Sequence, residues 1–208
     1  MGLFDFLNKN QPSKNVIQPT CKKSIDRIIQ ESDKAIEEMQ KADSVYNQDG
    51  DIEKRIKVYE KYLMGKPLWN SFNFSRSLVS MYLKSGRNNE AWSYLNQLIQ
   101  WSLDPESVGI DVSKVRYDQF KILKSEKKYS DALIMLVSSY VTSAYAIKDL
   151  YFNKEKFIKE AKTTAKGIGM SYEDLLVFAD DLEKDIKRKK IKESKIKEYC
   201  REHFGRTE

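Results

Sequence analysis

The pattern of apolar positions is helical along most of the chain. Between Ser24 and Gln48, large apolar side chains recur three or four residues apart, which is the period of one face of an α-helix. Alternating β-branched runs joined by hairpin turns are hard to find. The same helical period returns over residues 51–64, 74–85, 89–101, 113–125, 130–148 and from 171 onward. The sequence therefore predicts an all-α fold.

Glycines mark the turns between these predicted helices. Gly50 and Gly86 are about 36 residues apart, and each lies between two helical stretches. Glycine readily adopts the left-handed conformation that ends a helix, and Asp51 can cap the helix that follows. Tyr46 and Tyr82 precede the two glycines at equal spacing. A repeat of this length is typical of stacked helical hairpins.

One stretch resembles a known repeat family. Residues 78–98, LVSMYLKSGRNNEAWSYLNQL, resemble a tetratricopeptide repeat. The family pattern has an aromatic residue in its first helix, a turn glycine, an alanine in its second helix and then a large apolar residue. Tyr82, Gly86, Ala91 and Leu95 match it. The resemblance implies a tetratricopeptide-like array of antiparallel helical hairpins with C-terminal capping helices.

The resemblance extends over about residues 36–146 in three degenerate copies. The first copy departs from the pattern, because Arg55 stands where the family prefers alanine. An ordinary helical bundle uses the same residue types at these offsets and stays an alternative. We expect three segments: a flexible N-terminal segment (1–22), the hairpin array (23–150) and C-terminal helices with a basic tail (151–208).

The family holds its ligands on the concave side formed by the first helix of each repeat. Carried over by position, this resemblance implies a mostly basic groove, suited to a protein or an acidic peptide. A chaperone-tail clamp is disfavoured, because Ser77 and Asp118 occupy positions where that clamp needs other residues. The predicted partner-binding residues are Asn73, Arg76, Lys84, Lys114, Tyr117, Lys121 and Lys124.

The net charge of +6 is concentrated near the C-terminus, where residues 184–201 hold nine basic and three acidic side chains. We expect the helix that begins at Ser171 to continue through this stretch, polar on nearly every side past Ile186, and to project into water or lie on an acidic surface. A nucleic-acid-associated regulatory role is the alternative function, since clustered cations bind phosphates; a solvated helix end is the other interpretation. The candidate anion contacts are Lys187, Arg188, Lys189 and Lys190.

The residue types that most catalysis needs are scarce. His203 is the single histidine, and Cys21 and Cys200 are far apart in the sequence. No phosphate-binding glycine motif occurs, so we predict no catalytic, cofactor-binding or metal-binding residue and no enzymatic activity. No apolar run is long enough for a transmembrane segment. The sequence predicts a cytoplasmic protein–protein interaction adaptor, and its Lys, Asn, Ile and Tyr usage suggests a bacterial source.

Overall fold

The described part of the chain is all-helical. The computed structural model describes residues 19–65, 68, 70–103, 109–145, 154–188, 190–192 and 195–204, and these ranges contain no strand. The elements in chain order are α1 (Pro19–Asp49), α2 (Ile52–Leu63), α3 (Phe72–Lys84), α4 (Asn88–Ser102), α5 (Val112–Ser125), α6 (Tyr129–Tyr145), α7 (Lys154–Ala165), the 3₁₀ turn η1 (Lys166–Ile168), α8 (Tyr172–Lys187) and α9 (Ile196–Phe204). The predicted all-α class is confirmed.

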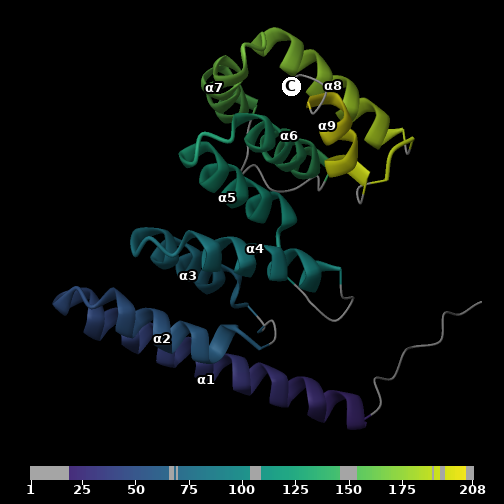
Figure 1. Cartoon of the computed structure of the whole chain (residues 1–208). Coiled ribbons are helices and arrows are strands. Elements are labelled where there is room, and N and C mark those ends of the chain that lie inside the picture. Colours follow the sequence, from purple (N-terminus) through teal and green to yellow (C-terminus); the bar gives the residue numbers. More distant parts are fainter. Residues whose placement is uncertain are drawn as a thin grey trace, which may run out of the picture.

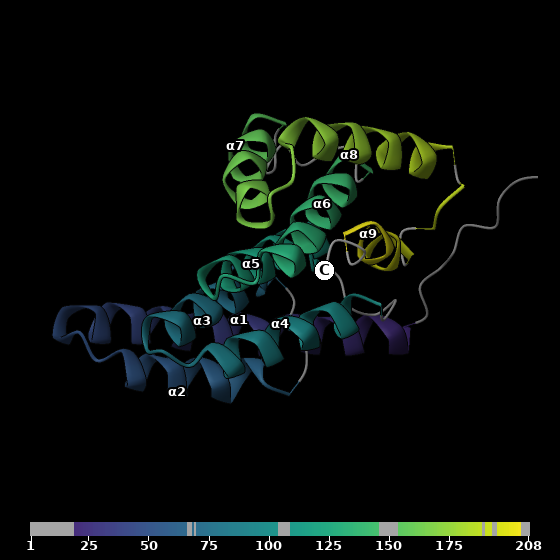
Figure 2. The same cartoon turned by 45° about the horizontal axis from the view of Figure 1, so that its top comes forward.

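Helices α1 to α6 pack in the order in which they occur in the chain, each one against the next. Figures 1 and 2 show them as successive layers, with α1 and α2 at one end of the molecule and α7 to α9 at the other. The turns have the chemistry that the sequence predicts. Gly50 and Gly86 have φ angles of 73° and 75°, and the Asp51 carboxylate accepts a hydrogen bond from the Lys54 amide, 3.0 Å away.

Two hydrophobic cores result from this packing. The lower core, formed by α1 to α5, encloses three tyrosines, and the hydroxyl of each has a hydrogen-bond acceptor. Tyr59 donates to Asp43 (2.9 Å), Tyr82 donates to Glu60 (2.9 Å) and Tyr94 donates to Ser75 (3.1 Å). Because buried polar groups are costly without partners, these bonds make aromatic burial between the layers favourable.

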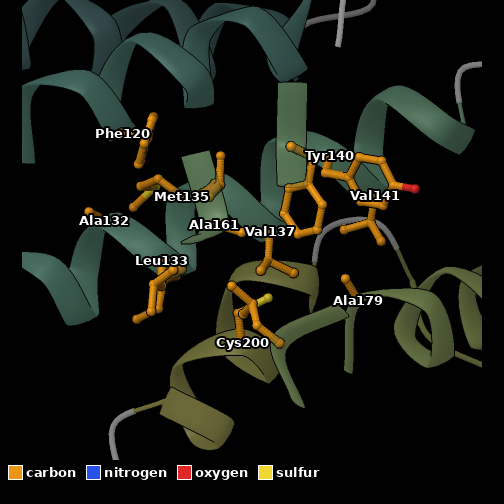
Figure 3. Close-up of a cluster of buried hydrophobic side chains, with 14 of the residues drawn as sticks. Phe120, Ala132, Leu133, Met135, Val137, Tyr140, Val141, Ala161, Ala179 and Cys200 are labelled. Carbon is orange, nitrogen blue, oxygen red and sulfur yellow. The ribbon is translucent and has the colours of Figure 1, made fainter. Parts of the chain in front are cut away.

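The upper core is built around α6, which packs against α5, α7, α8 and α9. All residues from Ala132 to Val141 are buried, as expected of a helix that is apolar on every side. Tyr140 stacks on Phe157 of α7 with ring centroids 4.3 Å apart, and Figure 3 shows Cys200 of α9 near Val137 of α6. The upper core thus contains residues on both sides of position 150.

Helix α5 joins the two cores. Its Phe120 and Leu123 belong to the upper core, whereas Val115 and Ile122 belong to the lower core. Trp92 of α4 packs against both. None of the described helices combines the length and the apolar character that spanning a membrane requires.

The C-terminal region corrects the prediction of one continuous helix. Helix α8 ends at Lys187 and α9 begins at Ile196. Ile196, Cys200 and Phe204 are fully buried, and the Ser138 hydroxyl of α6 donates to the Cys200 sulfur at 3.7 Å. The physical reason is that these three apolar residues, spaced four apart, form a stripe that returns α9 to the core.

The N-terminal helix differs from expectation at one position. Ile28, expected on the apolar face of the first helix, is 52% exposed, whereas Met39 is fully buried. Helix α1 extends beyond α2, so its first turns have no second helix to pack against (Figure 1). Residues 1–18, most of the expected N-terminal segment, lie outside the described part of the chain.

Buried tyrosines predict a loss of stability at alkaline pH. Burial raises the pKa of Tyr94 to about 12, above the value of 10.0 that it has when exposed. Above pH 10 the unfolded chain therefore releases this proton more readily than the folded chain, so the folded state is disfavoured as pH rises toward 12. We expect Tyr94 alone to contribute about 2 to 3 kcal/mol to this loss.

Urea denaturation followed by circular dichroism between pH 8 and 12 measures this effect. Tyr94→Phe has no hydroxyl to ionise, so its stability should fall less steeply over the same pH range. Equal slopes for the two proteins would contradict the prediction.

Candidate functional site

A solvent-accessible hollow of about 330 Å³ lies between α3 and α5. We call it the α3–α5 hollow. Three of the predicted partner-binding residues, Asn73, Arg76 and Lys121, line it. They reach it because α3 places Asn73, Arg76 and Ser80 on one face at three- and four-residue spacing. Lys84, also predicted, is exposed one turn beyond Ser80.

An ion pair holds the two walls of this hollow together. The Arg76 guanidinium donates to both carboxylate oxygens of Asp118, at 2.7 and 3.1 Å. The Asp118 side chain is only 4% exposed and that of Arg76 is 20% exposed. Lys121 contacts the same carboxylate at 2.5 Å. A bidentate pair fixes orientation as well as distance, so α3 and α5 are locked at this point.

Asp118 changes the electrostatic character expected of the groove. The predicted basic groove rests on the cations of this face alone. The carboxylate instead neutralises part of the charge of Arg76 and Lys121. The exposed cationic groups available to a partner are those of Lys121, on its solvent side, and Lys84.

The other predicted groove residues lie elsewhere. Tyr117 is buried and its hydroxyl donates to Glu160 of α7 at 3.4 Å. Lys124 contacts the same carboxylate at 2.7 Å. Helix α7 therefore buries Tyr117, which does not face a groove, whereas the Lys124 side chain is 31% exposed and its role stays a prediction. The transfer by position could not include α7, because α7 lies outside the region that resembles the repeat.

Lys114 lies on a separate, smaller hollow. This hollow has a volume of about 250 Å³ and includes Asn73, Tyr94 and Trp101 in its lining. Lys114 also contacts Asp111, the residue that caps α5, at 3.3 Å. Asn73 is common to both hollows. Four of the seven predicted residues therefore line two adjoining depressions rather than one continuous groove.

Two of the four candidate anion contacts of the tail form ion pairs. Lys187 pairs with Glu183, and Lys190 pairs with Asp185 at 3.3 Å. Arg188 is exposed just after the end of α8. Lys189 lies outside the described residues. Lys187 and Lys190 thus each pair with a carboxylate of α8. A count of charges along the sequence does not reveal such pairs.

The described residues offer no metal site, and their described cysteine is buried. Within the described ranges, no group of three or more His, Cys, Asp or Glu side chains is placed to hold a metal ion. Cys200 is buried and free, and burial raises the pKa of its thiol to about 11, which makes the reactive thiolate scarce at neutral pH. A scan against protein-family models and searches of curated proteins and of solved structures found no match for this chain.

Proposed function

We propose that this chain is a non-enzymatic adaptor that holds a protein partner in the α3–α5 hollow. One observation carries the proposal: two helices about one repeat apart in the sequence present side chains to a shared, open hollow, and the Arg76–Asp118 pair fixes their separation. A surface held rigid before binding loses less conformational entropy when a partner docks.

The arrangement of α1 to α6 supports a repeat interpretation within this proposal. Successive helices pack in chain order, and the α1–α2 and α3–α4 turns each contain a glycine of positive φ. We infer a tetratricopeptide-like array in which α1, α3 and α5 are the first helices of their hairpins. In such arrays the first helices provide the extended binding surface, and the α3–α5 hollow lies between two of them.

The charge of the hollow favours a partner that places a carboxylate against the rim of the hollow. Lys84 follows Ser80 by four residues, so it lies on the same face of α3, and Lys121 of α5 lines the hollow together with Ser80. Both lysines are exposed. Exposed ion pairs contribute about 0.2 to 1 kcal/mol each. Most of the affinity must therefore come from shape and apolar contact, including the partly exposed Leu83 of the hollow. A cytoplasmic location is part of the proposal.

Substitutions that leave the Arg76–Asp118 pair intact test this function. Ser80→Trp fills the hollow and Lys84→Glu reverses a charge at its rim, and both residues are exposed. We expect the double variant to recover at least about tenfold less partner than the unaltered chain in affinity purification from nuclease-treated lysate, quantified by mass spectrometry.

The matched control carries Ser93→Trp on α4 and Lys57→Glu on α2, two other exposed positions. It should retain the partner. Equal retention by all three proteins would refute the hollow as the binding site. Retention that depends on nucleic acid surviving the nuclease would favour the nucleic-acid alternative.

A further inference from the structure

A second open surface lies between α8 and α9, at the end of the molecule that α7 to α9 form. Its volume is about 690 Å³, roughly twice that of the α3–α5 hollow. We call it the α8–α9 groove. It exists because α9 turns back onto the core beside α8 (Figure 2). Helix α8 buries Leu175 and Ala179 in the core and presents a neighbouring face, with Val177 and Asp181, to the groove.

The floor of the α8–α9 groove is aromatic. Phe178 and His203 stack with ring centroids 3.8 Å apart and an interplanar angle of 8°. Tyr199 lies nearly parallel to Phe178, with centroids 6.2 Å apart. Val177 is 62% exposed and Tyr199 is 42% exposed. Aromatic and aliphatic groups gathered in an open groove mark an interaction site more often than a single exposed apolar residue does.

The rim of the groove is acidic. Asp174, Asp181, Asp185 and Glu202 belong to its lining, and none of the described residues that line it is lysine or arginine. This is an anionic surface on a chain whose net charge is +6. Asp181 pairs with Lys184 and Asp185 pairs with Lys190, but both lysines are about 61% exposed. Such exposed pairs are weak and exchange readily with other cations.

The spacing of the carboxylates indicates an elongated ligand. Asp174 and Asp185 are eleven residues apart on α8, which corresponds to about 16 Å along the helix axis. A single metal ion cannot contact groups so widely spread. The near-parallel rings of Phe178 and His203 do not enclose a cation on several sides. They offer flat faces on which a guanidinium can stack while it bonds to a carboxylate.

We propose that the α8–α9 groove binds a basic amphipathic helix of a partner protein, with its apolar side on Val177 and Tyr199 and its arginines against the acidic rim. Charge complementarity selects this occupant, and the length of the groove matches about three helical turns. Binding here is independent of the α3–α5 hollow. The chain would then engage two partners of different charge at two separate sites.

A peptide titration tests this proposal. The probe is a fluorescein-labelled amphipathic helix of about 16 residues built from Ala, Leu and Arg, and binding to the full chain is followed by fluorescence anisotropy. Asp181→Asn combined with Asp185→Asn should weaken binding about tenfold. Val177→Ser should weaken it about threefold by removing apolar contact. Added salt should weaken it as well.

Two controls separate a built site from general attraction of a polycation. Asp26→Asn combined with Asp33→Asn removes the same charge from exposed positions of α1 and should leave the affinity unchanged. A peptide of identical composition with leucines distributed on all sides should bind at least about fivefold more weakly. Equal weakening by both pairs of aspartate substitutions, or equal binding of the two peptides, would overturn the proposal.

The remaining outcomes are also decisive. The Ser80→Trp/Lys84→Glu variant should bind the peptide normally, so loss of the α3–α5 function does not affect this result. Analytical ultracentrifugation of the chain alone should show no dimer that depends on the groove. Any self-association should therefore be the same in the unaltered chain and in the groove variants. If the groove substitutions did abolish a dimer, the occupant would be a second copy of the chain and the proposal would be wrong. Circular dichroism must show unchanged helicity in every variant compared.

Discussion

Replacing Phe204 by alanine is expected to destabilise the protein by about 3 to 5 kcal/mol. Phe204 is near the C-terminus but has 0% of its surface exposed. Its ring packs edge-on against Phe178 of α8, with centroids 5.2 Å apart. The substitution removes most of a buried aromatic side chain and leaves a cavity among α6, α8 and α9. Urea denaturation followed by circular dichroism measures the change in the free energy of unfolding.

Tyr199→Ala is the matched control, because Tyr199 is an aromatic residue of the same helix that is 42% exposed. We expect it to cost no more than about 1 kcal/mol. Similar small effects for both variants would mean that α9 does not contribute to the upper core. The same reasoning applies to deletions: removing the basic tail after Glu183 also removes α9 and the buried Ile186. Such a deletion would expose the upper core and is not a clean test of the tail charges.

Replacing Asp118 by alanine is expected to destabilise the protein by about 3 kcal/mol. The substitution leaves the Arg76 guanidinium, which is 20% exposed, without the carboxylate that accepts its two hydrogen bonds. Partial exposure of Arg76 to water holds the effect at the lower end of the range for broken buried pairs. Thermal and urea denaturation measure the effect. Asp33→Ala on the exposed face of α1 should change stability by less than about 0.5 kcal/mol.

A double substitution distinguishes an ion pair from simple packing. Arg76→Leu combined with Asp118→Leu removes both charges, so it should cost less than Asp118→Ala alone. The matching single variants are Arg76→Leu and Asp118→Leu. If the stability lost in the double variant equalled the sum of the losses in these two, coupling between the side chains would be contradicted. The Arg76–Asp118 pair also limits the choice of binding variants. Arg76→Glu would place two carboxylates together and disturb folding. Binding is therefore tested at the exposed Ser80 and Lys84.

The sequence was sufficient to predict the helices from α1 to α6, because local signals determine the ends of several of them. Gly50 and Gly86 adopt the positive φ that stops a helix, and Asp51 caps the next helix through its carboxylate. Gly169 has a φ of 68° and ends η1. These effects involve residues within a few positions of one another, so the sequence contains them directly.

The sequence was insufficient where distant residues meet. The Arg76–Asp118 pair joins positions 42 residues apart, and no local pattern indicates that these two side chains face each other. The contacts of Tyr117 and Lys124 with Glu160 depend on the position of α7, which lies outside the region that resembles the repeat. Both cases require tertiary packing, which fixed offsets within a repeat do not describe.

The C-terminal region contained a signal that charge obscured. Ile196, Cys200 and Phe204 follow one another at intervals of four residues, which predicts an apolar helical stripe. The surrounding lysines and arginines drew the interpretation toward a solvated tail. The α8–α9 groove could not be predicted in the same way, because its acidic rim is assembled from two helices. The net charge of +6 for the whole chain gives no sign of a local acidic surface.

The most direct test of the proposed adaptor function is site-specific photocrosslinking from the α3–α5 hollow. A photoreactive amino acid at Ser80, inside the hollow, should form a covalent adduct with a discrete protein in lysate, and the same residue at the exposed Ser93 of α4 should not. Addition of Lys84→Glu should reduce the Ser80 adduct. If the two positions gave the same adducts, or if Ser80 crosslinked only to nucleic acid, the proposed protein-binding function of the hollow would be contradicted.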